Sequence, residues 1–410
     1  MRAYERLINY VKYDTASLHD QETYPSTPTQ LEFARLLKHE LTAMGLDPVL
    51  DNFGYVICKI PANIKYKVPT VALIAHMDTS PDASGKNVKP RIIYDYDGKD
   101  IVLNPELGII LSPEVFPSLK THIKEDLIVT DGTTLLGADD KAGIAEIMTL
   151  AEYIQNNPGF KHGEIVIVFT PDEEVGNGTK FLDIEAIGAD FAYTLDGSAA
   201  GEIAYENFNA ASAKITINGK SVHPGDAKGK MVNSILLAYE FENMLPAYMK
   251  PQTTEKYEGF NHLHHLEGNV EKTVVNYIIR NHDYRLFEKQ KADFLAIAQF
   301  LNRKYGENTI FMEITDSYFN MREKLDGKQE IIDIAIASIK ELGITPIVEP
   351  IRGGTDGARL TYMGLPCPNL GTGGYNYHGP YEYASIQEMD QCVEIIKKII
   401  EKITMMKASR

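Results

Sequence analysis

Three continuous apolar runs restrict the folds open to this chain of 410 residues. They occupy residues 71–75, 165–169 and 191–195 and are almost entirely aliphatic or aromatic. Such runs are typical of strands buried on both faces, as in a parallel sheet covered by helices. Segments with helical periodicity lie between them, including one that begins near residue 140 and stops at residues 156–159. The sequence therefore predicts an α/β domain with a mostly parallel sheet and helices on both faces.

The pattern changes near residue 208. Residues 208–319 predict strands and helices in the order β-α-β-β-α-β, which is typical of a ferredoxin-like unit. The pattern of the first domain resumes at residue 320. We therefore expect one domain formed by residues 1–207 and 320–410, with residues 208–319 inserted into it.

Asp-Gly pairs predict two β-hairpins in the first domain, because this pair favours two-residue hairpin turns. One turn is expected at residues 97–98, within 92–103, and the other at residues 131–132, within 127–136. The second hairpin would lead directly into the helix that begins near Asp139.

Composition limits the partners and the compartment. The formal net charge of −16 argues against nucleic acid and anionic membranes as partners, because both require a basic surface. The cysteines, Cys58, Cys367 and Cys392, are scattered and provide no paired thiolates for a metal. We find no signal peptide and no apolar run long enough to cross a membrane. We therefore expect a cytoplasmic protein in a reducing compartment.

Acidic and histidine side chains follow the predicted strands. In parallel sheets ligands bind outside the carboxyl ends of the strands, where these side chains would meet. A further carboxylate precedes the helix near residue 140, and a further histidine lies in a late loop. The full set is His76, Asp78, Asp139, Glu173, Glu174, Asp196 and His378.

Imidazole nitrogen and carboxylate oxygen suit a catalytic divalent metal site, and zinc is the first choice, with Co²⁺ or Mn²⁺ as possible substitutes. A single ion would leave several carboxylates crowded and unpaired, which is costly. Two ions that share one carboxylate would neutralise the cluster and activate a bridging water. We expect Asp139 to be the shared ligand. The other expected ligands form two pairs, His76 with Asp196 and Glu174 with His378.

Two carboxylates remain for other roles. Asp78 would accept the second ring N–H of His76 and fix its tautomer. Glu173 would be the general base that takes a proton from the water and passes it to the leaving amine. Taken singly, each of these side chains has an ordinary structural explanation. Their joint placement at strand ends favours a catalytic site.

Six motifs resemble those of a known family: HMD (76–78), GADDKAG (137–143), PDEE (171–174), LDG (195–197), RGGTDG (352–357) and YH (377–378). The set resembles the co-catalytic dizinc peptidases and amidohydrolases that include bacterial glutamate carboxypeptidase and aminoacylase. Within that family the chain is most similar to tripeptide aminopeptidases, over nearly its full length. The resemblance implies small peptides as substrates, cleaved at the N-terminal peptide bond.

The resemblance also implies roles for the inserted domain. It would act as a lid and form a homodimer, in which His223 reaches across to stabilise the oxyanion of the tetrahedral intermediate. Arg280 and Arg352 are candidates for binding a peptide carboxylate, because a guanidinium can bind one bidentately.

Other functions fit the same residues. The same chemistry would serve a dipeptidase, a carboxypeptidase or an N-acyl amino acid hydrolase. A non-catalytic, metal-dependent binding protein is a further alternative, although it would not need Glu173 as a base. Two-metal phosphoryl transfer is chemically possible, but the sequence has no glycine-rich phosphate loop.

Overall fold

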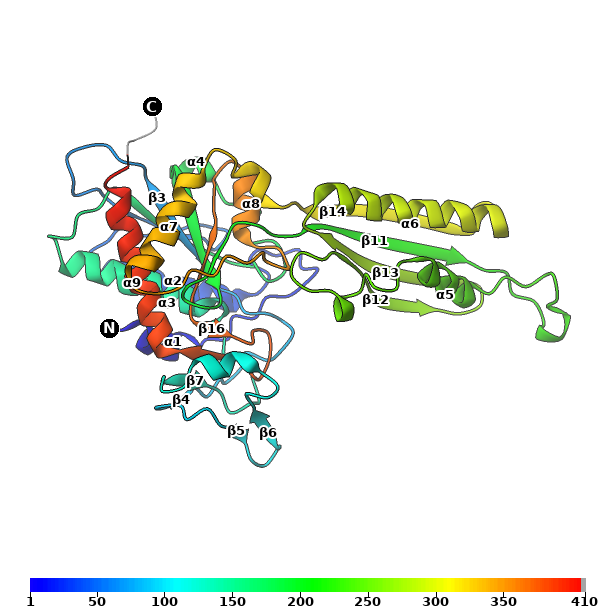
Figure 1. The fold of residues 1–410 in the computed structure, drawn as a ribbon, viewed down its shortest axis with the longest axis horizontal. Coiled ribbons are helices and arrows are strands. Elements are labelled where there is room, and N and C mark those ends of the chain that lie inside the picture. The colour runs from blue at the N-terminus through cyan, green and yellow to red at the C-terminus, as the bar shows by residue number, and fades with distance from the viewer. Residues whose placement is uncertain (407–410) are drawn as a thin grey trace. The chain divides into compact units, whose positions relative to one another are not determined.

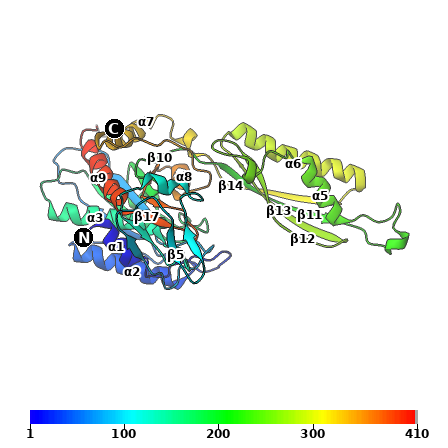
Figure 2. The ribbon, with the colours of Figure 1, turned by 60° about the horizontal axis from the view of Figure 1, so that its bottom comes forward.

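The computed structural model describes residues 1–406, which form two compact units (Figures 1 and 2). Unit 1 comprises Met1–Tyr205, Lys324–Glu349 and the chain from Thr355 onward. Unit 2 comprises Glu206–Glu323 together with the short segment Pro350–Gly354. The sequence predicts that short segment to belong to the first domain, whereas in the structure it belongs to unit 2. Among residues 1–406, none of the helices combines the length and apolar character needed to span a bilayer.

A seven-stranded sheet forms the centre of unit 1, with the strand order β1-β2-β8-β3-β9-β15-β10. Strands β8, β3, β9 and β15 run parallel, and the outer strands pair antiparallel. All residues of β3 and β8 are buried, so the prediction of a mostly parallel sheet is confirmed. The strands are β1 (Val49–Leu50), β2 (Val56–Ile60), β3 (Val71–His76), β8 (Ile165–Thr170), β9 (Phe191–Gly197), β10 (Ile203–Ala204) and β15 (Asn369–Gly371).

Helices cover both faces of this sheet, as expected. Ala72 on one face packs in a cluster with Ile187 of α4 and Leu360 of α8. Helix α3 packs on the other face, where a Cβ built on Gly143 would lie 2.1 Å from the carbonyl oxygen of Leu195. The helices of unit 1 are α1 (Ala3–Tyr10), α2 (Pro28–Ala43), α3 (Ala138–Asn156), α4 (Ile184–Ile187), α7 (Gln329–Glu341), α8 (Asp356–Tyr362), α9 (Ile386–Ile403) and the 3-10 helix η1 (Pro117–Thr121).

Both predicted hairpins are wrong. Asp97 and Asp131 each accept a hydrogen bond from the backbone N–H two residues later, a local turn that competes with strand pairing. The strands nearby pair with other segments, forming one sheet in the order β16-β17-β7-β4 and a separate pair β5-β6. These strands are β4 (Arg91–Ile93), β5 (Ile101–Asn104), β6 (Ile109–Leu111), β7 (Leu127–Val129), β16 (Gly374–Tyr375) and β17 (Tyr383–Ser385).

Unit 2 has a four-stranded antiparallel sheet in the order β12-β13-β11-β14. Alternate residues of β11 and β13 form one core with the apolar sides of α5 and α6, so both helices lie on one face (Figure 2). The expected ferredoxin-like order is confirmed. Its elements are β11 (Asn209–Asn218), α5 (Ser234–Met244), β12 (Phe260–Gly268), β13 (Lys272–Asn281), α6 (Tyr284–Tyr305) and β14 (Ile310–Tyr318), with 3-10 helices η2 (Pro224–Asp226) and η3 (Pro251–Thr253); η4 (Met321–Lys324) follows β14.

Candidate metal centre

The carboxyl ends of three adjacent parallel strands bring the first site residues together in unit 1. His76 is the last residue of β3, and it lies opposite Thr170, the last residue of β8. Glu173 and Glu174 follow β8 within four residues, and Asp196 lies in β9 one residue before its end. Because these strands are parallel neighbours, their side chains meet at one edge of the sheet.

Asp139 enters the site from the start of α3. Gly137 has a φ of +83°, in the left-handed region that glycine adopts readily. Asp139 and Asp140 depart from helical dihedral angles, and the peptide bond between them is cis. Regular helix therefore begins only after Asp140, so Asp139 lies ahead of it, as the sequence predicts.

The carboxylate of Asp139 lies between the two histidines of the site. Its Oδ1 is 2.8 Å from Nε2 of His76, and its Oδ2 is 3.1 Å from Nε2 of His378. Asp196 Oδ1 is 3.5 Å from the same nitrogen of His76. Glu174 Oε2 is 3.0 Å from the same nitrogen of His378. The five side chains thus form two groups with Asp139 in common.

Asp78 connects His76 to the loop that carries the glutamates. Nδ1 of His76 is 3.0 Å from the backbone oxygen of Asp78 and 3.4 Å from its carboxylate. The same carboxylate accepts the backbone N–H groups of Glu173 at 3.0 Å and Glu174 at 3.1 Å. Asp78 is fully buried. Asp78 therefore orients the ring of His76 mainly through its backbone oxygen. Its side chain holds the loop that carries Glu173 and Glu174.

Burial and mutual repulsion shift the pKa values of these groups. Burial raises the pKa of Glu174 to about 8 and that of Asp196 to about 6, and the Asp139 carboxylate adds to both shifts. Hydrogen bonds to Asp139 and Glu174 raise the pKa of His378 to about 11. The raised pKa values mean that the crowded carboxylates favour a nearby positive charge, which a bound proton can supply. Oε1 of Glu174 is buried without a hydrogen-bond partner among residues 1–406, which leaves it open to a cation.

Glu173 lines a small space together with His76, Thr170 and Asp356. Burial raises its pKa well above the ordinary value for a glutamate. A carboxylate in such surroundings gains from accepting a proton, which is the property required of a general base.

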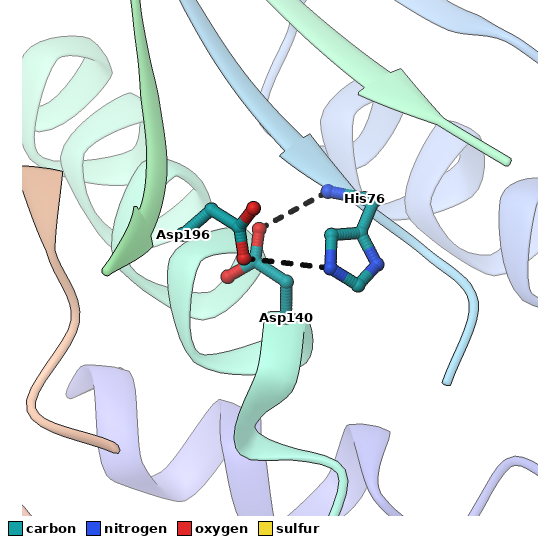
Figure 3. Close-up of side chains that lie close together, drawn as sticks. All are labelled: His76, Asp140 and Asp196. Carbon is teal, nitrogen blue, oxygen red and sulfur yellow. Dashed lines mark hydrogen bonds and ion pairs between the residues drawn. The ribbon is translucent and has the colours of Figure 1, made fainter. Parts of the chain in front are cut away.

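Residues that the sequence analysis did not select also support the site. Oδ2 of Asp140 accepts the backbone N–H of His76 at 3.1 Å, and Figure 3 shows it beside His76 and Asp196. Tyr377 donates to the carbonyl oxygen of Gly197 at 2.8 Å and so ties the loop before His378 to the end of β9. Both residues lie inside the quoted motifs. Each is adjacent to a predicted site residue, and this adjacency could have identified them from the sequence.

Glu382 is a further supporting residue and is 1% exposed. Its Oε2 accepts the backbone N–H groups of Leu136 at 2.6 Å and Gly137 at 2.8 Å, and its Oε1 accepts that of Asp139 at 3.1 Å. Glu382 therefore holds the segment that leads into Asp139. No motif marks it in the sequence.

Three selected residues, His223, Arg280 and Arg352, belong to unit 2. His223 is exposed and accepts the N–H of Gly225 at Nδ1. Arg280 donates to the backbone oxygens of Ala211 and Ile279. The guanidinium of Arg352 donates to backbone oxygens within residues 254–258 and stacks on aromatic rings at positions 208 and 260. Both arginines thus have partners inside unit 2.

Comparison with known proteins agrees with this geometry. The profile of Peptidase family M20/M25/M40 matches residues 130–402. The chain is 57% identical to Peptidase T of Halothermothrix orenii, over 97% of this chain and 98% of that protein. The chain therefore belongs to peptidase family M20/M25/M40, which confirms the family resemblance of the six motifs.

Solved structures share the fold. A tripeptidase from Staphylococcus aureus has a TM-score of 0.80 and 24% sequence identity, with 99% of this chain and 98% of that chain covered. A Bacillus subtilis protein described as a dinuclear metal binding peptidase of family M20 has a TM-score of 0.64 and 14% identity, with 98% and 99% covered. At these identities the likeness concerns the fold.

Proposed function

We propose that this chain is an aminopeptidase that removes the N-terminal residue from tripeptides. Its membership of a peptidase family and its 57% identity to a Peptidase T support this substrate class. The observation that carries the proposal is the carboxylate of Asp139 between two imidazoles, each with a second carboxylate beside it. That arrangement suits a dinuclear hydrolytic centre.

We propose two zinc ions as the cofactor, with Co²⁺ or Mn²⁺ as possible substitutes. Asp139 would be shared, His76 and Asp196 would hold one ion, and Glu174 and His378 the other. Nitrogen and oxygen donors of this kind suit zinc, and the raised pKa values and the unpartnered Oε1 of Glu174 fit a site built for cations. When bound, the ions would polarise the scissile carbonyl group and acidify a water molecule.

Glu173 is the proposed general base. It accepts a proton from the attacking water and delivers it to the amine of the leaving dipeptide. Asp78 supports this role by holding the backbone N–H of Glu173 and by orienting His76. In this scheme His223 stabilises the oxyanion, and Arg280 or Arg352 binds the peptide carboxylate. Use of Arg352 would require release of its bonds to residues 254–258.

The test is hydrolysis of Ala-Ala-Ala by the purified protein before and after treatment with a chelator, with metal measured per chain. We expect chelator-sensitive release of the N-terminal alanine and close to two ions per chain. Glu173→Gln should retain both ions and lose at least ~100-fold in kcat, the low end for general base catalysis. Turnover of N-acetyl amino acids in place of tripeptides would refute the substrate class. Unchanged turnover by Glu173→Gln would refute the base.

We also propose a homodimer formed through unit 2, in which His223 acts in the site of the partner subunit. A mixture of His223→Ala and Glu173→Gln chains tests this directly. Each variant alone should be inactive, whereas a mixed dimer regains one site with Glu173 from one chain and His223 from the other. If the two variants exchange subunits and the mixture stays inactive, His223 does not act across a dimer. A cytoplasmic location is proposed as well, supported by free, buried cysteines at positions 58, 367 and 392.

A further inference from the structure

A cavity of about 400 Å³ lies in unit 1. Its walls come from the loop before α2, from the N-terminus of α2, and from the loop that follows Asp78. Its volume falls within the range of small-molecule sites, ~300–1,000 Å³. Asp82 lines this cavity and also reaches the metal centre.

Asp82 contacts the far side of the His378 ring. Its Oδ2 is 3.5 Å from Nδ1 of His378, while Nε2 of the same ring faces Asp139 and Glu174. One imidazole ring therefore separates Asp82 from the carboxylates at the centre. In a peptide the α-ammonium nitrogen is two bonds from the scissile carbonyl carbon of its residue. A group that recognises the ammonium must lie this close to the reacting atoms.

Asp82 is a carboxylate that is available close to the metal centre. The carboxylates of Asp78 and Glu382 are buried and accept backbone N–H groups. The side chain of Asp82 is 68% exposed, and its carboxylate lies 3.5 Å from Nδ1 of His378. A carboxylate with no short hydrogen bond to give up gains a new partner when it binds a cation.

Charged side chains of both signs line the cavity, with Asp14 and Asp82 as the acidic groups and Lys86 as the basic group. The N-terminus of α2 carries partial positive charge from its free N–H groups, and no side chain caps it. Among these groups, Asp82 also lies 3.5 Å from Nδ1 of His378, so it is the candidate partner for an ammonium group near the metal centre. Ala16, Leu18, Pro28, Pro81 and Ala83 provide apolar surface in the remaining space.

We propose that Asp82 binds the free α-ammonium group of the peptide substrate and that this cavity receives the side chain of the N-terminal residue. The inference rests on the proposed aminopeptidase function and adds to it the group that selects an unblocked N-terminus.

Asp82→Asn tests the proposal because it removes the charge at constant size. We compare kcat/KM for Ala-Ala-Ala with the inhibition constant of propionyl-Ala-Ala, the same peptide without its amino group. The variant should lose ~10–100-fold in kcat/KM, the effect of a hydrogen bond to a charged group, while it keeps both metals. The inhibition constant should stay within about twofold, because the analogue has no ammonium. Asp97→Asn, an exposed aspartate that does not line the cavity, is the matched control.

Ala83→Phe tests the cavity. It should reduce kcat/KM for Leu-Gly-Gly at least ~10-fold more than for Gly-Gly-Gly, since bulk would fill the space that the side chain needs. An equal loss for both peptides would overturn the assignment of the cavity.

Two results would overturn the role of Asp82. One is unchanged kinetics in Asp82→Asn. The other is a parallel loss for Ala-Ala-Ala and for propionyl-Ala-Ala, because a residue that acts only through His378 would affect both. Failure of the proposed function has a different signature, since the wild-type protein would then cleave N-acetyl-Ala-Ala-Ala in preference to the free tripeptide.

Discussion

Glu382→Gln should weaken metal binding although Glu382 is not among the proposed ligands. The carboxylate accepts three backbone N–H groups around Asp139, and glutamine has one acceptor oxygen for them. Its NH₂ group would face at least one N–H, so one charge-assisted hydrogen bond is replaced by two opposed donors. Hydrogen bonds to charged groups contribute ~1.5–3 kcal/mol, which equals ~10–150-fold in a binding constant. Loss of a residue that orients a ligand typically costs ~10–100-fold in metal affinity.

The assay is a competition titration of the metal-free protein with a chromophoric chelator. Glu146→Gln is the matched control, because Glu146 is also fully buried, lies in α3, and has two carboxylate oxygens without partners in the described part of the chain. We expect Glu382→Gln to lose ~10–100-fold in affinity for at least one ion and Glu146→Gln to bind as the wild type does. Wild-type affinity in Glu382→Gln, or an equal loss in both variants, would refute the reasoning.

The same variant has a defined pH dependence. Burial raises the pKa of Glu382 to about 7. Above this pH the wild-type residue is a charged acceptor, and below it the residue is neutral, as glutamine is. The difference in metal affinity between wild type and Glu382→Gln should therefore shrink as the pH falls from about 8 to about 6. A difference that stays constant over this range would show that the charge of Glu382 has no part in the effect.

Two further predictions concern the packing of α3. Burial raises the pKa of Glu146 well above its ordinary value, so its cost to the folded state grows as the pH rises above the unfolded pKa of ~4.3. Glu146→Met should raise the free energy of unfolding in urea by ~1–3 kcal/mol at pH 8 and by less at pH 4; equal gains would contradict this. Gly143→Ala places a Cβ 2.1 Å from the Leu195 oxygen, so it should lower the free energy of unfolding by ~1–3 kcal/mol and reduce the metal content. Gly159→Ala is the control, because its Cβ meets open space and should change neither quantity.

The sequence was sufficient to predict the sheet and the central cluster because both depend on regular geometry. A strand buried on both faces requires an unbroken apolar run, and parallel neighbours place the residues after such runs at one edge. The proposed ligands His76, Glu174 and Asp196 were found in this way. Asp139 was found from its place before a helix start, and His378 was added as the histidine of a late loop, a position for which no such rule exists.

Other features depend on contacts that no local pattern records. Glu382 bonds to Asp139 across 243 residues of sequence, and no motif marks it in the sequence. The two predicted hairpins are absent from residues 92–103 and 127–136 because of a local contact. The Asp97 and Asp131 side chains each accept a backbone N–H two residues later, and this local turn forms in place of the hairpin turn that Asp-Gly predicts. The partners of Arg352 within residues 254–258 likewise appear only when the chain is folded.

The insertion sets the order in which a growing chain can complete its parts. Synthesis runs from the N-terminus, and domains fold as units once their residues have emerged. All six elements of the ferredoxin-like unit precede β15 and α9 in the chain, whereas His378 follows Asp139 by 239 residues. The inserted unit can therefore be finished while the catalytic sheet still lacks an inner strand. A chain that stops before residue 378 would keep the insert and lack His378, one of the proposed metal ligands.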